Sequence, residues 1–410
     1  MGEDKPEAGL RYLEVIVKMT ERCNINCDYC YVFNRGNDQW KVDPPVIRQP
    51  VIEDLADFLA EGARDIGIKT VQIDFHGGEP LLMKKARFDE ACTTLSDRVT
   101  PHATVRFALQ TNAMLVDDDW IALFEKHRVH ASVSLDGPQA MNDAHRIDHK
   151  GRGTYAQTVD GLRRLQAAHA EGRTPVAPGL LCVINPEFDG AEIYRHFVHD
   201  LRLKGVDFIL PDLNHEEVDD RYVQRLGDYI VAVFDAWAAD DDKSIDIRLF
   251  SSQMRVLLGA PASFIGFAAG VRGALAFTVG SEGSIYVDDT LRSTGHEVFS
   301  SMGKLKDLTV RDVMDSPQTR LLNQLSIPAQ PCMECVWNAT CAGGRLVNRL
   351  SKDRGFDNPS VFCGALRRMY SRLTAYLVNS GIPIELIEAN LGLRCLEPAL
   401  EPANAVLEIA

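Results

Sequence analysis

Three cysteines form a CxxxCxxC array in the stretch Cys23-Asn24-Ile25-Asn26-Cys27-Asp28-Tyr29-Cys30, which follows a short apolar run at residues 12–17. Thiolates at this spacing can surround one corner of an iron-sulfur cluster. Such clusters usually have four cysteine ligands, so three neighbouring cysteines without a fourth indicate a cluster with one iron open to a substrate or cofactor. Two alternatives remain from these residues alone: a zinc site, which normally needs a fourth local Cys or His, and three unrelated buried thiols.

The residues after the array make the pattern more specific. A tyrosine follows Cys30, and a strand-like stretch at residues 70–75 leads into Gly77-Gly78-Glu79-Pro80. This combination resembles the radical S-adenosylmethionine (radical SAM) superfamily. The resemblance implies three ligands for a [4Fe-4S] cluster whose open iron binds SAM: Cys23, Cys27 and Cys30. It also implies that three residues lie beside the methionine end of SAM, where glycines let the backbone approach closely: Gly77, Gly78 and Glu79.

The composition agrees with a soluble enzyme. The 410 residues are long for one domain and suit a large catalytic domain with an appendage. A net charge of −14 argues against a general nucleic-acid-binding protein, because no basic surface is available to neutralise phosphates. No apolar run of about 18 residues occurs, and residues 1–9 are polar and acidic, so neither a membrane span nor a signal peptide is expected. The protein is expected to be cytoplasmic, and its ten cysteines to be metal ligands rather than disulfides.

Strand-like and helix-like segments alternate along the chain up to an acidic stretch at residues 239–242. Six strands are expected, at residues 12–18, 70–75, 104–110, 130–135, 177–184 and 206–210. Helices are expected between them, at residues 51–66, 84–99, 117–127, 154–169 and 190–203. This alternation predicts an α/β fold with a parallel sheet and helices outside it. The resemblance implies the partial (β/α)6 TIM-like barrel of the radical SAM superfamily.

Polar residues follow every expected strand, at the end of the barrel where such enzymes place their chemistry. In related radical SAM enzymes a strand-end Asn, a Ser and a downstream Arg line the SAM pocket, and the resemblance places Asn112, Ser134 and Arg146 there. The planar fork of Arg146 could hold the SAM carboxylate. Asp136 is a further candidate, although strand-end Asn, Ser and Asp are also common turn formers. His76 is expected near the cluster, as a hydrogen-bonded structural histidine rather than a proton-transfer group.

A second group of cysteines lies further along the chain, in a CxxCxxxxxC run with one more cysteine downstream: Cys332, Cys335, Cys341 and Cys363. Four thiolates suit either a structural zinc or an iron-sulfur cluster. The run continues into Ala342-Gly343-Gly344, and Gly-Phe-Asp-Asn-Pro-Ser-Val-Phe precedes the last cysteine at residues 355–362. This segment is similar to the SPASM appendage of radical SAM peptide-modifying enzymes. The resemblance implies that the four cysteines hold one auxiliary [4Fe-4S] cluster.

The full SPASM pattern holds a second auxiliary cluster, whose ligands are missing from this sequence. That pattern has cysteines in a Gly-containing hairpin and one more cysteine four residues after the third of the run. Position 345 is Arg, and the hairpin residues 283–289 contain no thiol. One auxiliary cluster rather than two is therefore expected. Cys92 and Cys182 lie in apolar segments and are expected to be small buried side chains, whereas no role is assigned to Cys395.

Five regions are expected along the chain. The acidic stretch at residues 239–242 follows a helix-like segment at 222–237 and suggests the end of the barrel. Beyond it, residues 245–250 are strand-like, and 274–279 with 283–287 suggest a β-hairpin. The regions are an N-terminal tail at 1–11, the partial barrel at 12–240, a bridging region with the hairpin at 241–330, the SPASM-like region at 331–375, and a C-terminal helix and tail at 376–410.

The resemblance covers nearly the whole chain and implies an activity. A reduced radical SAM cluster cleaves SAM to a 5′-deoxyadenosyl radical, which abstracts hydrogen from an unreactive C–H bond. The sequence most resembles maturases of ribosomally synthesised peptides (RiPPs), and among them the group that forms cyclophanes by joining an aromatic ring carbon to a β-carbon. The expected partners are a precursor peptide, with leader and core, and a small electron donor such as flavodoxin or ferredoxin. No nucleic acid or membrane partner is expected.

Three alternatives stay open. Two are other enzymes of the superfamily: thioether-forming (sactipeptide-type) peptide maturases, and sulfatase maturases that generate formylglycine. The latter usually carry both auxiliary clusters, so the missing ligands count against them. The third is a non-catalytic iron-sulfur scaffold that binds peptide, against which the near-complete SAM-pocket motif argues.

A cyclophane-forming enzyme needs a group that removes the ring proton. Three carboxylates are candidates: Asp212 at an expected strand end, and Asp288 and Asp289 in the hairpin where the lost cluster would lie. Each of them could equally be a solvated turn residue. An auxiliary cluster with four cysteine ligands has no open iron, so its expected role is to accept an electron.

Overall fold

The computed structural model describes residues 10–260 and 274–393, so Cys395 lies outside the described residues. The chain divides into two compact units. The first comprises Met1–Ser134, Asp143–Pro178 and Arg272–Leu322, and the second comprises Leu135–Asn142, Gly179–Val271 and Asn323–Ala410. Each unit therefore combines segments that are far apart in the sequence. Within the described residues, no helix is both long and apolar enough to cross a membrane.

The first unit is built on a mainly parallel sheet. Its strands are β1 (Tyr12–Thr20), β2 (Thr70–Gly77), β3 (Thr104–Thr111), β4 (His130–Ser134), β8 (Ala274–Val279), β9 (Ser284–Tyr286) and β10 (Gly303–Lys304). Their order is β10-β9-β8-β1-β2-β3-β4. The hairpin expected from the sequence is confirmed, because β9 pairs antiparallel with β8. In addition β8 pairs parallel with β1, so that Tyr12 lies between Thr70 and Ala274 in the centre of the sheet.

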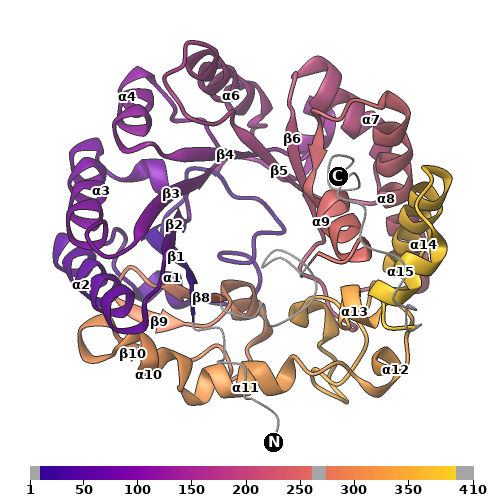
Figure 1. Ribbon diagram of the computed structural model, residues 1–410. Helices are drawn as coiled ribbons and strands as arrows, with labels where there is room; N and C mark the ends of the chain where they lie inside the picture. The colour runs from indigo at the N-terminus through magenta and orange to yellow at the C-terminus, as the bar shows by residue number, and fades with distance from the viewer. Residues whose placement is uncertain (1–9, 261–273, 394–410) are drawn as a thin grey trace, which may run out of the picture. The chain divides into compact units, whose positions relative to one another are not determined.

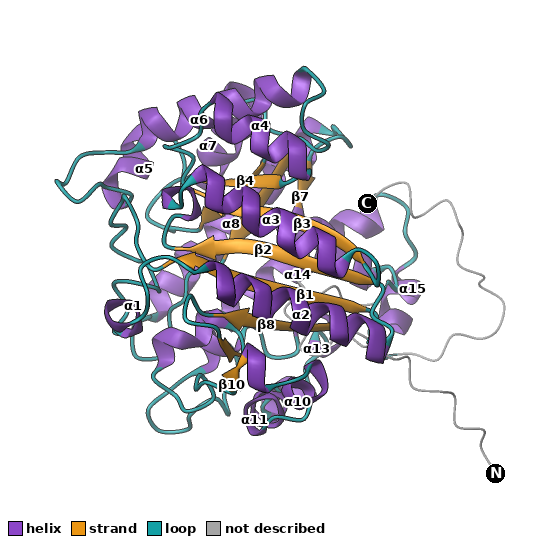
Figure 2. Ribbon diagram, turned by 90° about the vertical axis from the view of Figure 1, so that its left-hand side faces the viewer, coloured by secondary structure: helices purple, strands orange, loops and turns teal. Residues whose placement is uncertain are grey.

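Amphipathic helices cover one side of strands β1 to β4 (Figure 1). They are α2 (Gln49–Ile66), α3 (Lys85–Val99), α4 (Asp118–His127) and α6 (Tyr155–Ala170). Side chains along β2 alternate between buried and half-buried positions, and buried Phe75 meets Phe88 of α3 with 5.0 Å between the ring centroids. Helices α2 and α3 run side by side across these strands (Figure 2). The side chain of Asp117 caps α4 by accepting a hydrogen bond from the backbone N–H of Trp120 (2.9 Å).

The described part of the second unit contains three further parallel strands. In it β5 (Gly179–Val183) pairs with β6 (Gly205–Ile209), and β6 pairs with β7 (Asp246–Ile247). The main helices are α7 (Gly190–Arg195), α8 (Asp220–Asp240), α9 (Arg248–Leu257), α14 (Cys363–Asn379) and α15 (Ile384–Asn390). Helix α8 packs against α7 and α14. Helix α8 extends three residues beyond the expected 222–237 and ends at Asp240, inside the acidic stretch at residues 239–242.

Two expected elements differ from the structure. The strand predicted at residues 245–250 is reduced to the two residues of β7, and α9 begins at Arg248. The buried side chains of α9 fall on one helical face, which the short window hid: Leu249, Phe250, Ser251, Gln253, Met254 and Leu257. The helix predicted at 190–203 is divided into α7 and a π-helical turn, η2 (His196–Asp200).

The other described helical elements are short: α1 (Gln39–Val42), η1 (Pro80–Leu82), α5 (Gln139–His145), η3 (Asp289–Thr294), η4 (Leu305–Asp307), α10 (Val310–Met314), α11 (Pro317–Leu325), α12 (Gln330–Met333), α13 (Asn338–Cys341) and η5 (Leu346–Arg349). The predicted α/β class is confirmed, because helices alternate with strands that are mostly parallel. Several of the short elements follow the strands and carry the candidate site residues.

Candidate active site

The three cysteines of the CxxxCxxC array lie in the loop that follows β1. Cys27 is buried, whereas Cys23 and Cys30 are half-buried, and the backbone N–H of Cys30 donates to the carbonyl of Cys27 (3.1 Å). Burial raises the pKa of Cys23 to about 12, with further contributions from Glu79 and from the other two cysteines. The three thiols thus lie close enough to influence one another. They fit a [4Fe-4S] cluster with three protein ligands.

Gly77 and Gly78 pack against the backbone that leads into this loop. The N–H of Gly78 donates to Thr20 O and that of Glu79 to Arg22 O, both at 2.8 Å. A Cβ on Gly77 would lie 2.2 Å from Thr20 O, and one on Gly78 would lie 2.1 Å from Arg22 O. The glycines were expected because of close approach to a ligand. The structure supplies another reason, which is close approach of the end of β2 to the cluster loop.

Replacing Gly78 by alanine is expected to destabilise the protein by about 1–3 kcal/mol, as overpacking does, and to lower its iron content after reconstitution. The reason is that the backbone of Arg22 cannot yield without moving the cluster loop. Denaturant unfolding and iron analysis would measure both effects. Gly205→Ala is the matched control, because an added Cβ there meets nothing within 4 Å. Equal effects of the two substitutions would contradict this account.

Glu79 is buried and joins the ends of β2 and β3. Its Oε1 accepts hydrogen bonds from the Thr111 hydroxyl (2.7 Å) and the Leu81 N–H (3.1 Å), and its Oε2 accepts one from the Asn112 N–H (2.8 Å). Burial raises the pKa of Glu79, whereas these donors lower it. The carboxylate therefore fixes the loop after β3, including Asn112, next to the cluster loop.

The other predicted SAM-pocket residues of the first unit also have protein partners. Asn112 Nδ2 donates to Asn24 Oδ1 (2.8 Å) and lies 3.9 Å from Cys23 Sγ. Ser134 Oγ accepts from Gln110 Nε2 (2.7 Å). Arg146 is buried, and its Nη1 donates to the hydroxyl of Tyr29, inside the cysteine array (2.8 Å). The structure thus brings Asn112 and Arg146 to the cluster loop.

Asp136 belongs to the second unit. Its Oδ1 accepts a hydrogen bond from the N–H of Val183, the last residue of β5 (3.1 Å). Its own N–H donates to the side chain of Asn142 (3.3 Å). These contacts give Asp136 a structural role at the end of β5, as the turn-forming interpretation anticipated.

A group of charged and polar side chains, four of them buried and two half-buried, lies beside the loop with the three cysteines, and the sequence did not reveal most of it. This buried ion network consists of Lys18, Glu21, Tyr31, His76, Asp289 and Arg292. The ammonium of Lys18 forms an ion pair with Asp289 Oδ2 and lies 3.3 Å from His76 Nδ1 and 3.5 Å from the Tyr31 hydroxyl. The Tyr31 hydroxyl donates to Asp289 Oδ2 (2.6 Å). Arg292 Nε lies 3.5 Å from Asp289 Oδ1.

Burial and charge shift three pKa values in the buried ion network. Burial alone would raise the pKa of Asp289, but the charges of Lys18 and Arg292 outweigh it and lower this pKa to about 2. Burial lowers the pKa of His76 to about 3, and the Lys18 charge adds to this, so His76 is neutral at pH 7. With Lys18 as donor to its Nδ1, the imidazole hydrogen is assigned to Nε2. Burial raises the pKa of Glu21 to about 7, and its Oε2 lies 3.8 Å from Arg292 Nη1.

Of the three proposed proton acceptors, only Asp289 belongs to this network. Asp288 is exposed, and its carboxylate accepts hydrogen bonds from the N–H (2.9 Å) and hydroxyl (2.8 Å) of Thr290, so it caps η3. Asp212 lies in the second unit after β6, where its Oδ1 is 2.9 Å from Arg345 Nη2. Arg345 also donates to Leu210 O (3.0 Å). The arginine at the position of a missing cluster cysteine is therefore held by an ion pair.

The four downstream cysteines converge in the second unit. They lie in α12, in the turn after it, at the end of α13 and at the first residue of α14: Cys332, Cys335, Cys341 and Cys363. Burial raises the pKa of Cys341 to about 12, and the three other thiols contribute to this shift. In the described part of the chain, no three Cys, His, Asp or Glu side chains are placed to hold a single metal ion. Four neighbouring thiols can hold either a zinc ion or a [4Fe-4S] cluster.

Cys92 and Cys182 are fully buried, as expected for small apolar side chains. No contact among the described residues links either of them to the two groups of neighbouring cysteines.

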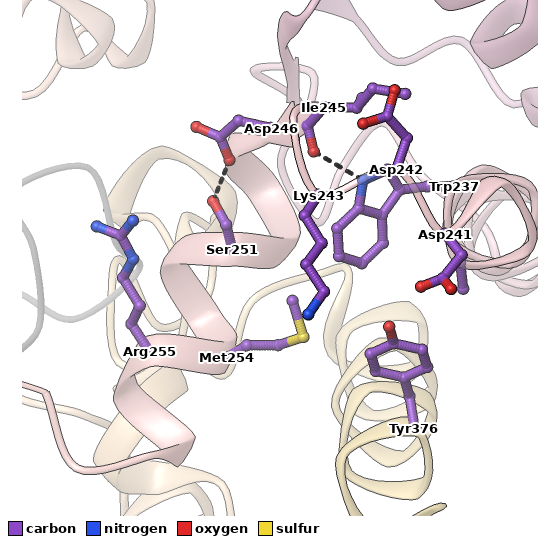
Figure 3. Close-up of a pocket in the computed structure, with 11 residues that line it drawn as sticks. Trp237, Asp241, Asp242, Lys243, Ile245, Asp246, Ser251, Met254, Arg255 and Tyr376 are labelled. Carbon is purple, nitrogen blue, oxygen red and sulfur yellow. Dashed lines mark hydrogen bonds between the residues drawn. The ribbon is translucent and has the colours of Figure 1, made fainter. Parts of the chain in front are cut away.

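A cavity of about 230 Å³ lies in the second unit, between the end of α8, the start of β7, α9 and α14 (Figure 3). In it Trp237 Nε1 donates to Ile245 O (3.0 Å) and Ser251 Oγ to Asp246 Oδ1 (2.5 Å). Hydrogen bonds from Lys204 and Ser244 lower the pKa of Asp242 at its rim. The cavity lies where β7 begins, which in barrel folds is the end that serves stability rather than catalysis. None of the predicted site residues lines it.

Residues 17–181 match the model of the Radical SAM superfamily, which covers the cysteine array and the predicted SAM-pocket residues up to Arg146. The cysteine-type anaerobic sulfatase-maturating enzyme of Clostridium perfringens is 23% identical over 381 residues, covering 90% of this chain and 98% of that protein. The serine-type enzyme of Bacteroides thetaiotaomicron is 23% identical over 400 residues, covering 90% and 92%.

Solved structures show the same fold. Native anSMEcpe with bound AdoMet superposes with a TM-score of 0.76 at 22% identity, covering 90% of this chain and 99% of that one. Streptococcus suis SuiB bound to the precursor peptide SuiA superposes with a TM-score of 0.55 at 15% identity, covering 86% and 76%. Residues 17–181 therefore contain a radical SAM domain, and the chain shares the α/β fold of these solved structures.

Proposed function

We propose that this enzyme uses SAM and two [4Fe-4S] clusters to oxidise the β-carbon of a residue in a ribosomally synthesised peptide. A peptide substrate is supported by two proteins of similar fold: anSMEcpe, which has been solved with the Kp18Cys peptide, and SuiB, solved with its precursor peptide. A small one-electron donor such as flavodoxin or ferredoxin would supply the electron for SAM cleavage. Cys23, Cys27 and Cys30 would hold the SAM-binding cluster, and the four downstream cysteines the auxiliary one.

We further propose that the product is a cyclophane. The observation that supports this is the replacement of second-cluster ligands by residues with fixed roles: Asp288 caps η3, and Arg345 pairs with Asp212. The enzyme would therefore work with one auxiliary cluster. The β-carbon gives a hydrogen atom to the radical derived from SAM and then forms a bond to the ring. The ring loses one proton to a carboxylate and one electron to the auxiliary cluster, so that the peptide loses two hydrogens in total.

Asp289 is the proton acceptor that its contacts support best. It is 2% exposed, and Lys18 and Arg292 keep it ionised, so it is a carboxylate at any pH well above 2. Although such a group is a weak base, the ring becomes a strong acid once it can regain aromaticity by losing a proton. Its hydrogen bond to Tyr31, the neighbour of Cys30, ties Asp289 to the cluster loop. Asp212 and Asp288 are the weaker candidates because their oxygens serve an ion pair and a cap.

A second candidate function is the oxidation of a Cys or Ser to formylglycine. The comparisons favour it over the cyclophane, since several relatives that span most of this chain are sulfatase-maturating enzymes. The missing second-cluster ligands argue against it. Both functions begin with oxidation at a β-carbon, so the same carboxylate and auxiliary cluster would serve either. A thioether-forming maturase remains a third possibility, because the same residues would also serve it.

Coexpression with small peptides encoded near the enzyme, followed by mass spectrometry, tests these functions. A loss of two hydrogens with every cysteine still open to alkylation indicates a carbon–carbon cross-link. The same loss with a blocked cysteine indicates a thioether, and an aldehyde that reacts with a hydrazide indicates formylglycine. If reduced enzyme and SAM yield no 5′-deoxyadenosine, the chain is a scaffold rather than a catalyst.

Arg146→Lys is expected to weaken SAM binding by about tenfold or more while the iron content stays unchanged. Lysine keeps the charge but loses the planar fork that can hold a carboxylate with two hydrogen bonds. Equilibrium binding of SAM to the reconstituted protein measures the effect. Arg152→Lys is the control, since Arg152 is an exposed residue of the same segment that pairs with Asp148. Unchanged affinity in Arg146→Lys would assign Arg146 to structure alone.

A further inference from the structure

Arg349 is a buried cation in the region of the downstream cysteines. It ends η5, and it is among the largest side chains that are fully buried. Its Nε donates to Phe356 O (3.1 Å) and Asn358 O (3.0 Å), and its terminal nitrogens donate to Ile327 O (2.7 Å) and Ser326 O (3.3 Å). All four acceptors are neutral backbone carbonyls. Each nitrogen of the guanidinium thus has an acceptor, but none of these acceptors carries a charge.

No carboxylate forms an ion pair with Arg349 within the described residues. Asp357 is the carboxylate that acts on Arg349, and it is paired instead with Arg354 at 3.2 Å. Burying a charge without a counter-charge is costly. The two other cations among the largest fully buried side chains, Lys18 and Arg292, both face Asp289. We therefore expect an anion other than a protein carboxylate beside Arg349.

The side chain of Arg349 lies next to a cysteine of the auxiliary group. A Cβ built on Gly343 would lie 3.7 Å from Cys332 Sγ and 3.8 Å from both Cδ and Nε of Arg349, so the two side chains border the same small space. Gly343 itself adopts a φ of 84°, in the left-handed region that glycine tolerates. Four thiolates around a [4Fe-4S] core carry a net negative charge, which increases by one when the cluster is reduced.

We propose that Arg349 is the counter-ion of the auxiliary cluster and raises its reduction potential. This inference rests on the proposed auxiliary cluster. A fixed cation stabilises the more negative, reduced form, and burial strengthens the interaction because little water screens it. The cluster then accepts the electron released when the peptide intermediate loses its proton to a carboxylate. Arg349 affects the reaction only through the reduction potential of the cluster, and it contacts no reacting atom.

The test is a redox titration of the auxiliary cluster, followed by electron paramagnetic resonance. It uses the full chain with Cys23, Cys27 and Cys30 replaced by alanine, so that only the auxiliary cluster gives a signal. Three variants are compared in this background: Arg349→Met removes the charge, Arg349→Gln removes it but keeps an amide donor, and Arg349→Lys keeps it. Arg368→Met is the control, because Arg368 lies on α14 near Cys363 but is paired with Asp228 at 2.6 Å.

We expect the Met and Gln variants to hold at least tenfold less reduced cluster at a fixed potential, which is about 59 mV for a one-electron couple. The Lys variant and the control should keep the original potential. An unchanged reduction potential in a cluster-loaded Gln or Met variant would overturn the proposal. A shift in the Lys variant as large as in the Met and Gln variants would also overturn it, because hydrogen bonds rather than charge would then set the potential. If the Arg349→Met variant does not fold, the potential of the Arg349→Gln variant provides the test. Absence of iron from the parent of this series would instead refute the auxiliary cluster itself.

Discussion

Replacement of Cys23, Cys27 and Cys30 by alanine is expected to abolish SAM cleavage completely. The two proposed [4Fe-4S] clusters require about eight irons per chain, and the variant should keep about four of them in the auxiliary site. The physical reason is that only the cluster with three protein ligands leaves an iron open for SAM. Iron analysis after anaerobic reconstitution and detection of 5′-deoxyadenosine measure the two effects.

Cys92→Ala is the matched control for this experiment. Cys92 is buried in α3 and is expected to act only by packing, so its loss should leave iron content and SAM cleavage intact. Near twelve irons in the parent protein would contradict the single auxiliary cluster. Stoichiometric zinc would contradict the assignment of the four downstream cysteines.

Asp289→Asn is expected to uncouple SAM cleavage from peptide modification, with a loss of product of about a hundredfold or more, which is typical for loss of a general base. The amide has nearly the same shape but cannot accept the ring proton. Formation of 5′-deoxyadenosine should continue, because no cluster ligand is touched. The ratio of modified peptide to 5′-deoxyadenosine in single-turnover reactions measures the coupling.

Asp288→Asn provides the comparison, since it changes a neighbouring carboxylate that caps η3 and is exposed. It should keep its coupling ratio and lose only some stability. Full coupling in Asp289→Asn would exclude Asp289 as the acceptor. If Asp212→Asn alone were uncoupled, the acceptor would be Asp212, which pairs with Arg345.

Breaking the buried ion network has a further cost that must be separated from catalysis. Removing one member of a buried ion pair typically costs about 3–5 kcal/mol, because the other charge is left unpaired. Asp289→Asn removes the carboxylate that faces both Lys18 and Arg292, and the pKa of Glu21, 3.8 Å from Arg292, is raised to about 7. Unfolding measurements on the same variants show whether lost coupling merely reflects lost structure.

Local patterns predicted the elements of the fold well. The segment at 51–66 has apolar residues at helical spacing and forms α2, and the alternating pattern at 70–75 forms β2. The strand prediction at residues 245–250 was wrong, because six residues are too few to distinguish the apolar periodicity of a strand from that of a helix. The buried face of α9 becomes clear only over a longer segment. The parallel pairing of β8 with β1 could not be predicted, because it depends on which sheet edge is left free after β2, β3 and β4 have assembled.

The parts of the candidate site that depend on short sequence motifs could be predicted. The parts that depend on ion pairs between distant residues could not. The cysteine groups and the Gly77-Gly78-Glu79 segment stand out as short motifs. Lys18 gave a weaker signal, as a charged residue inside an otherwise apolar strand. Its partner Asp289 stands out in the sequence only as a possible proton acceptor, and no sequence pattern marks Arg292 or Arg349. A buried cation becomes visible only when the fold shows which anion is missing beside it.

The position of β1 between β2 and β8 also sets an order of assembly. During synthesis the cysteine array and β1 leave the ribosome early, and β2 can pair with β1 soon after, whereas β8 follows only after β3 to β7 have been made. Contacts between distant segments form more slowly than local ones because they close longer loops. The loop with Cys23, Cys27 and Cys30 is therefore made while β1 still lacks one of its two neighbouring strands. Asp289 and Arg292, which follow β8, join Lys18 last.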